Sequence, residues 1–306
     1  MSKKVNTSLR ISAGRIVMKK TSIICSLLLL ILAFSFAEKG IEKELFHITK
    51  LVGSLYRIEY SPSYNLVQLA SIGDEGILLI DTGMESTAQA LLRELKKMCS
   101  GKIAYIINTH VHQDHVGGNP VFAPEAPIIA HINVKKRYSP PHLLPIKRKG
   151  EPNITFADTM NLLFNGETVI IKHVPSGHTD GDSIVYFPDS NILYMGDLVI
   201  SGRFSTIDLS LGGDVDGFIN NLKSLISDYP DATRYFPAHG PEYSKHDLIK
   251  YHQAFAETLL PIERELKRGK TVEQIVNSEV FKDYRDWLRK DDWVKVIQTR
   301  LNRKDH

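Results

Sequence analysis

Hydrophobic positions along the chain predict short strands that alternate with helices from about residue 45 onward. Apolar, β-branched runs bounded by Gly, Asn, Asp and Pro are typical of strands, and they lie at residues 51–60, 65–72, 76–80, 103–107, 127–130, 162–164, 168–174, 183–187, 192–195 and 233–236. Apolar residues at helical spacing predict helices at residues 86–98, 132–138, 216–227, 247–267, 272–277 and 284–301. Asn165-Gly166 favours a tight type I′ hairpin turn. Hairpins mixed with helices predict an α/β fold built on mixed sheets.

The first 37 residues follow a different pattern. They carry six basic residues and no acidic one, then an apolar run at residues 23–36 that ends in Ser35-Phe36-Ala37. This order is typical of a secretory signal peptide, so we expect residues 1–37 to be removed and the mature chain to be periplasmic or secreted. Met18, followed by two lysines, is an alternative true start. An uncleaved anchor is the competing interpretation, but the run is short for a span of about 20 residues.

Removal of that segment changes what the charge implies. The whole chain of 306 residues has a net charge of +3, and the loss of six positive charges leaves the mature chain at −3. The sequence therefore predicts no nucleic-acid partner and no stable membrane insertion after cleavage. Cys99 is then the only thiol, so we expect stability to come from the core or from bound metal. Residues 38–245 are predicted to form the main domain, and residues 246–306 a helical extension that packs on it through Trp287, Trp293 and Ile297.

The segment from Thr109 to His115 carries the chemistry. It reads Thr-His-Val-His-Gln-Asp-His and follows directly after the apolar strand at 103–107. In an extended segment, side chains two residues apart point the same way, so His110 and His112 can hold one ion. Asp114 and His115 come after a turn and are expected to face a neighbouring position. Imidazole and carboxylate ligands suit zinc, iron or manganese.

Three further candidate ligands each follow a predicted buried strand and lie beside a glycine. They are His178, Asp197 and His239. Ligands collect at strand ends in sheet proteins, and glycine lets the backbone approach closely. A single Asp or His after a strand is usually a turn or cap residue, but the recurrence of the pattern indicates one shared site.

These motifs resemble those of the metallo-β-lactamase superfamily. The pattern His-x-His-x-Asp-His is intact, the three later single ligands match, and Ile80-Asp81-Thr82-Gly83 matches the first motif of the family. The resemblance covers roughly residues 45–245. It implies a metallo-β-lactamase-type αβ/βα sandwich of two mixed β-sheets flanked by helices, with a metal centre at one edge.

The resemblance also implies a role for each ligand. The first metal would be held by His110, His112 and His178. The second would be held by Asp114, His115 and His239. Asp197 would bridge the two, and Asp81 would fix the histidine loop through hydrogen bonds.

The expected activity is hydrolysis with two zinc ions per chain, iron or manganese being alternatives. Two metals about 3.5–4 Å apart can share a hydroxide that attacks a carbonyl centre, and Asp114 would orient it and pass a proton to the leaving group. We expect a small ester, lactone or lactam as substrate. A β-lactamase with a cysteine ligand is excluded because Cys99 lies on a predicted helix far from the motifs, and export disfavours a glutathione thioesterase. A mononuclear iron enzyme similar to persulfide dioxygenases and a non-catalytic metal-binding protein stay open, as does the oligomeric state.

The substrate pocket is less clearly marked in the sequence than the metal ligands. A Pro- and Lys-rich surface loop is predicted at residues 139–153. Candidate pocket residues are Tyr64, Tyr138, His142 and Arg203. His173 lies on the predicted strand before His178 and is a candidate for supporting it.

Overall fold

The computed structural model describes residues 45–60, 66–98, 102–138 and 149–304. The predicted signal segment, Tyr64, Cys99 and His142 lie outside these ranges. The chain divides into two compact units, Met1–Phe46 and His47–His306, and the architecture described below is that of the second. No helix within the described ranges is long and apolar enough to cross a lipid bilayer.

The first sheet has seven strands in the order in which they occur along the chain. They are β1 (Phe46–Val52), β2 (Leu55–Tyr60), β3 (Leu66–Gly73), β4 (Gly76–Ile80), β5 (Ile103–Asn108), β6 (Ile128–His131) and β7 (Ile154–Phe156). The strands β2, β3 and β4 pair antiparallel, whereas β4 to β7 pair parallel. The predicted strand at 51–60 covers β2 but only the last two residues of β1, because the chain turns at Gly53 with φ 52°.

The second sheet has five strands in the order β12-β11-β10-β9-β8. They are β8 (Thr159–Phe164), β9 (Glu167–His173), β10 (Ser183–Phe187), β11 (Ile192–Tyr194) and β12 (Arg234–Phe236). Only β11 and β12 pair parallel. The predicted hairpin is confirmed, since Asn165 and Gly166 both have positive φ, at 52° and 78°, as a type I′ turn requires.

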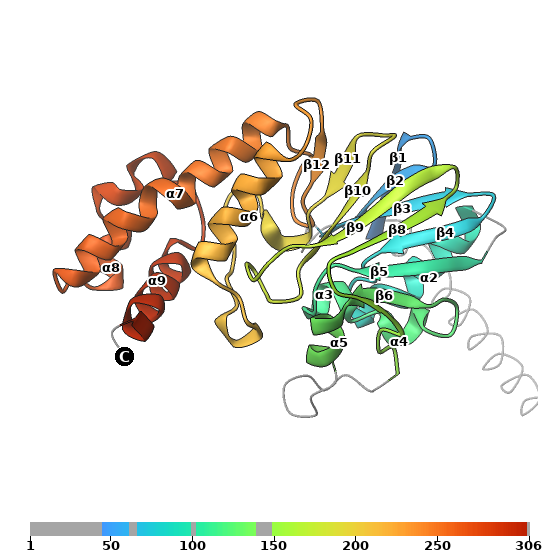
Figure 1. Cartoon of the computed structure of the whole chain (residues 1–306), viewed down its shortest axis with the longest axis horizontal. Helices are drawn as coiled ribbons and strands as arrows, with labels where there is room; N and C mark the ends of the chain where they lie inside the picture. The colour runs from blue at the N-terminus through green and yellow to red at the C-terminus, as the bar shows by residue number, and fades with distance from the viewer. Residues whose placement is uncertain (1–44, 61–65, 99–101, 139–148, 305–306) are drawn as a thin grey trace, which may run out of the picture. The chain divides into compact units, whose positions relative to one another are not determined.

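Helices cover the outer faces of both sheets (Figure 1). Those near the first sheet are α2 (Glu85–Met98), α3 (Gln113–Val116), α4 (Asn119–Phe122) and α5 (Ile132–Tyr138). Those near the second sheet and beyond it are α6 (Val215–Ser227), α7 (Lys245–Lys267), α8 (Val272–Val276) and α9 (Lys290–Lys304). The described ranges also contain three 3-10 turns, namely η1 (Gly196–Leu198), η2 (Leu209–Leu211) and η3 (Glu279–Tyr284).

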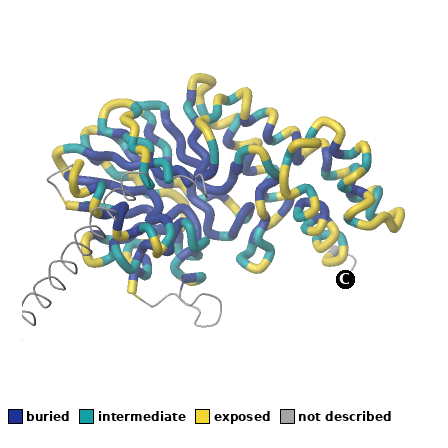
Figure 2. The backbone as a smooth tube through the Cα atoms, turned by 180° about the vertical axis from the view of Figure 1, so that it is seen from behind, coloured by how far each residue is buried: buried dark blue, intermediate teal, exposed yellow. Residues whose placement is uncertain are grey.

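Successive side chains along the strands of the second sheet belong to two separate hydrophobic clusters. Tyr194 and Phe236 point inward and pack with Ile80 and Ile107 of the first sheet. Their neighbours, among them Leu193, point outward into the cluster formed with α6 and α7, because successive side chains of a strand face opposite sides. Buried residues accordingly follow the strands (Figure 2). The predicted sandwich of two mixed sheets flanked by helices is confirmed.

The C-terminal helices share the outer core of the second sheet. Trp293 of α9 is 1% exposed, stacks on Phe204 and donates a hydrogen bond from Nε1 to Thr258 Oγ1 at 2.9 Å. The prediction of one helix at 284–301 is wrong over its first turn. The backbone of Leu288 instead forms hydrogen bonds with Gly202 and Phe204. Arg289 then adopts a left-handed φ of 60°, directly before α9 begins.

Candidate metal centre

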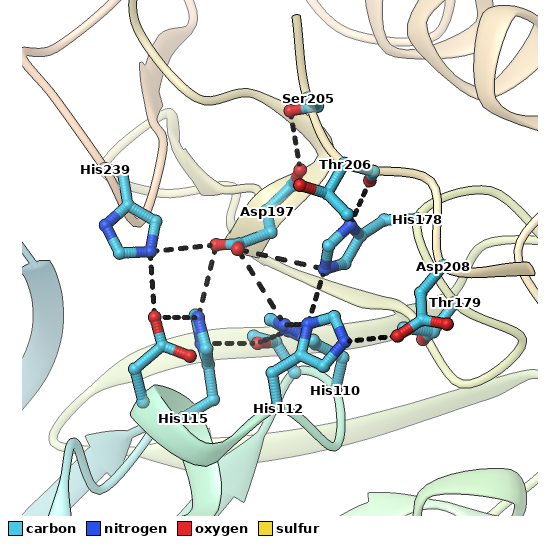
Figure 3. A network of polar contacts seen from close by, with 12 residues as sticks. His110, His112, His115, His178, Thr179, Asp197, Ser205, Thr206, Asp208 and His239 are labelled. Carbon is cyan, nitrogen blue, oxygen red and sulfur yellow. Dashed lines mark hydrogen bonds and ion pairs between the residues drawn. The ribbon is translucent and has the colours of Figure 1, made fainter. Parts of the chain in front are cut away.

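Strand ends bring the seven predicted ligands together, and six of them are labelled in Figure 3. The segment after β5 supplies four of them, and the segments after β9, β11 and β12 supply one each. They form two groups whose candidate ligand atoms lie within 4.8 Å of one another. The first group is His110, His112, His178 and Asp197, and the second is Asp114, His115, Asp197 and His239.

Three imidazoles of the first group converge through one nitrogen each. His112 Nδ1 lies 3.2 Å from His110 Nε2 and 2.8 Å from His178 Nε2. Asp197 Oδ2 is 4.0 Å from His110 Nε2 and 3.8 Å from His178 Nε2. Burial, reinforced by neighbouring imidazoles, lowers the pKa of His110 well below its usual value. Burial likewise lowers the pKa of His178 to about 4, although Asp197 opposes it. Both rings therefore favour the neutral form, which is the form that binds metal.

The second group contains more negative charge. Asp114 Oδ2 is 3.1 Å from His239 Nε2, and Asp197 Oδ1 is 3.2 Å from His115 Nε2 and 3.5 Å from His239 Nε2. Burial raises the pKa of Asp197, but His115 and His239 outweigh it and hold that pKa far below its usual range. Burial also raises the pKa of Asp114, but His115 and His239 outweigh it and keep that pKa very low. Both side chains are therefore carboxylates at neutral pH.

Two buried atoms of the second group test whether a metal fits. His115 Nε2 and Asp197 Oδ1 make no hydrogen bond within the described part of the chain, although they face each other. An unsatisfied buried polar atom costs about 1–3 kcal/mol. The two atoms lie 3.2 Å apart, and each can give a lone pair to a cation once His115 has lost the proton on Nε2. A cation there would satisfy both, so the donor set fits a metal. The carboxylate of Asp197 belongs to both groups, which is consistent with a dinuclear centre.

Asp81 holds the ligand loop of this group through hydrogen bonds. Its side chain is fully buried, and its carboxylate accepts hydrogen bonds from Thr109 N, Thr109 Oγ1 and His115 Nδ1, each at 2.8 Å. Tyr194 donates a longer one at 3.4 Å. With Nδ1 held by Asp81, His115 can offer only Nε2 to a metal. The hydrogen bonds expected of Asp81 are thus present.

Two acceptors of the first group were missed by the sequence analysis. The Thr206 carbonyl lies 2.5 Å from His178 Nδ1, and Asp208 Oδ2 lies 3.1 Å from His112 Nε2 (Figure 3). Both come from the irregular segment between η1 and η2. The only local signal is that Asp208 caps η2 by accepting from Ser210 N and Leu211 N, and this signal indicates a turn rather than a ligand partner.

A cavity of about 320 Å³ opens onto the two groups. Besides five of the ligands, its lining includes Ile200, Arg203 and Thr206. Of the predicted pocket residues that lie in the described ranges, Arg203 lines this cavity. Tyr138 does not, because its side chain is buried and its hydroxyl donates to the Lys149 carbonyl at 3.3 Å.

His173 also lies outside the two ligand groups. Its ring stacks on His131 with centroids 3.7 Å apart, and its Nδ1 lies 2.8 Å from the Asp182 carbonyl. The stack joins the ends of β6 and β9, one strand from each sheet. Its described contacts therefore tie the two layers together close to the ligand-bearing loops.

Comparisons with known proteins agree with this geometry. The sequence profile of the Metallo-beta-lactamase superfamily matches residues 59–239. A hydroxyacylglutathione hydrolase of Synechococcus sp. (strain JA-3-3Ab) is 28% identical over 192 residues, which is 60% of this chain and 69% of the relative. A metallo-beta-lactamase type 2 of Bacillus sp. (strain 170) is 24% identical over 193 residues, covering 60% of this chain and 68% of the relative.

Solved structures show the same fold. The metallo-beta-lactamase from Pontibacter korlensis superposes with a TM-score of 0.60 at 23% identity, covering 69% of this chain and 99% of that one. The DIM-1 metallo-beta-lactamase gives a TM-score of 0.58 at 20% identity, covering 70% and 97%. The profile match spans more than half of the chain and includes all seven candidate ligands, and the chain belongs to the metallo-beta-lactamase superfamily.

Proposed function

We propose that the chain is a metal-dependent hydrolase that uses two zinc ions to cleave a small ester, lactone or lactam. The observation that carries this proposal is the pair of ligand groups joined through Asp197 beside an open cavity. When bound there, two metal ions would polarise the substrate carbonyl and lower the pKa of the attacking water. The names of the relatives, a hydroxyacylglutathione hydrolase and a metallo-beta-lactamase, support hydrolysis of a small molecule.

Asp114 is the residue we assign to proton transfer. It lines the cavity and is 23% exposed, more than any other carboxylate in the two groups. Because its pKa is very low, it is an ionised carboxylate at neutral pH, and it can accept a hydrogen bond from the attacking water and help to pass the proton to the leaving group. His239 Nε2 lies 3.1 Å from Asp114 Oδ2, so a metal held by both side chains would fix the direction in which the carboxylate points.

The substrate class follows from charge and from the expected route of the protein. A mature net charge of −3 and the absence of a basic stripe in the sequence disfavour a polyanionic substrate such as nucleic acid. The predicted signal segment would take the chain to the periplasm or outside the cell, away from a cytosolic thiol pool. We therefore propose an ester, lactone or lactam rather than a glutathione thioester.

Metal content measured together with hydrolysis tests the proposal. The purified protein should carry two metal ions and hydrolyse at least one member of a panel of esters, lactones and lactams. His112→Ala should lose the activity and one metal, whereas the matched control His246→Ala, an exposed histidine of α7, should keep both. One iron per chain with oxygen uptake would instead indicate an oxidoreductase. Two bound metals without any turnover would indicate a non-catalytic metal-binding protein.

A further inference from the structure

The segment between η1 and η2 contacts two histidines of the first group on the side that faces away from the other ligands. Thr206 accepts from His178 Nδ1, and Asp208 Oδ2 accepts from His112 Nε2 (Figure 3). The opposite ring nitrogens, His178 Nε2 and His112 Nδ1, then lie 2.8 Å apart within the group. A hydrogen bond to the outer nitrogen fixes which ring nitrogen keeps the proton and which one is free for a metal.

His112 needs such a contact more than its partners do. The side chains of His110 and His178 are each 2% exposed, so packing holds their rings. The His112 side chain is 25% exposed and borders the cavity. A half-turn of its ring about χ2 would remove Nδ1 from the group, and packing opposes such a turn less at this more exposed ring than at the other two. Within the described part of the chain, the Asp208 carboxylate is the one hydrogen-bond partner of His112 outside the ligand groups.

The geometry at Asp208 calls for a carboxylate. Its Oδ1 accepts from Ser210 N at 2.9 Å, from Ser210 Oγ at 2.5 Å and from Leu211 N at 3.1 Å. Its Oδ2 is directed to His112. Both oxygens therefore act as acceptors, which an ionised carboxylate allows and an amide does not.

The backbone of Asp208 is tied to the loop that carries His178. Asp208 N donates to the His178 carbonyl at 2.9 Å, and Gly213 N donates to the Asp208 carbonyl at 2.8 Å. Asp214 N donates to the Gly177 carbonyl at 2.9 Å. The Asp208 side chain thus starts from a fixed position relative to the first group, and this position makes it suitable for orienting a ligand.

We propose that Asp208 is a positioning residue that holds His112 with Nδ1 facing the first group, and that it thereby sets the affinity of this group for its metal. The inference rests on the proposed function in so far as the first group binds a metal. Asp208 would act through His112 alone, without contact with the substrate or the reacting atoms.

Asp208→Asn is the direct test because it keeps the size of the side chain and removes one acceptor. If the amide oxygen stays on Ser210 and Leu211, its NH2 group opposes the proton on His112 Nε2. If the amide flips, its NH2 group opposes the backbone N–H groups of η2. Loss of such a supporting contact typically weakens metal binding about 10–100-fold. We expect this loss for one of the two zinc ions and wild-type affinity for the other, measured by competition with a chromophoric chelator.

Asp214→Asn is the matched control. Asp214 lies after η2, directly before α6, and caps α6 through Gly217 N at 2.7 Å. It is exposed, and its described hydrogen bonds do not reach a ligand. The substitution removes the same charge and the same kind of cap, so both zinc affinities should stay within about twofold of wild type.

Ring-nitrogen NMR of the zinc protein gives a readout that a purely structural role would not move. In the wild type, His112 should carry its proton on Nε2 with the metal on Nδ1, and this signature should be lost or heterogeneous in Asp208→Asn. Circular dichroism of the metal-free variants checks that both fold. The proposal is overturned if Asp208→Asn binds both zinc ions as the wild type does, or if Asp214→Asn weakens binding equally. A wild type that binds two zinc ions and hydrolyses nothing would contradict the proposed function alone.

Discussion

Replacement of Asp81 by asparagine should separate the stability of the fold from the affinity of the metal centre. Asn tolerates the left-handed φ of 61° that Asp81 adopts, and it has the same size. The substitution therefore replaces one acceptor oxygen by an NH2 group and changes little else in the shape of the side chain. Asp81 accepts from Thr109 N, from Thr109 Oγ1 and from His115 Nδ1 in a fully buried position, so this exchange happens out of reach of water.

The magnitude depends on the proton of His115. If the amide oxygen keeps Thr109 N, the new NH2 group faces His115 Nδ1. Burial lowers the pKa of His115, but Asp197, Asp81 and Asp114 outweigh it and raise this pKa. The substitution removes one of these three carboxylates, and a neutral His115 with its proton on Nε2 can then accept from the amide, which limits the loss of unfolding free energy to about 1–2 kcal/mol. That tautomer no longer offers Nε2 to a metal. We therefore expect metal at the second group to bind about 10–100-fold more weakly, which adds about 1.4–2.7 kcal/mol to the loss in the metal-bound protein.

Unfolding in guanidinium chloride, with saturating chelator and with a fixed concentration of zinc, measures the two contributions. Asp74→Asn is the control, because Asp74 is exposed in the turn between β3 and β4 and its loss removes the same charge. The control should match the wild type in both conditions. An equal stability loss with and without zinc, or none in either, would refute the tautomer argument.

Three further predictions concern the layers and loops around the site. Burial and the neighbouring His173 lower the pKa of His131 to about 4. Since the unfolded chain takes up this proton near pH 6.5, the unfolding free energy is full above that pH and should fall between about pH 6.5 and 4, by at most about 3 kcal/mol. His131→Leu should reduce this pH dependence when unfolding without metal is compared at pH 7 and pH 5. Trp293→Ala should cost about 3–5 kcal/mol in chemical denaturation, since the indole is 1% exposed. Gly217→Ala should weaken zinc binding in chelator competition, because its Cβ would overlap a backbone carbonyl of the loop before His178.

Most strands and all seven candidate ligands could be predicted from the sequence because both depend on residues that are close in the chain. A ligand such as His178 follows an apolar run and stands beside a glycine, and this pattern is readable within about ten residues. The hairpin at Asn165-Gly166 depends on the backbone preferences of two residues. The strand β7 was missed because its three residues, Ile154–Phe156, are too few to show a period. Their pairing with β6 is decided by the rest of the sheet.

The prediction of a helix at 284–301 was wrong over its first turn for a related reason. Its apolar residues have helical spacing, but Leu288 forms backbone hydrogen bonds with Gly202 and Phe204, more than eighty positions earlier. A local pattern carries no information about such a partner. The same limit applies to the residues that orient the ligands. Asp208 is 96 positions from His112, and its sequence neighbourhood indicates only a turn.

The metal centre is assembled across the two sheets, and this makes its affinity sensitive to how the sheets pack. His110 and His112 follow a strand of the first sheet, whereas His178 and Asp197 follow strands of the second. Tyr194 links the layers directly, since its hydroxyl donates to the Val67 carbonyl of the first sheet at 2.7 Å. The type of each ligand is a local property of the sequence, but the distance between ligands is a property of the interface between the sheets. A substitution that shifts one sheet against the other should therefore weaken metal binding without replacing any ligand, because both groups need atoms from both layers.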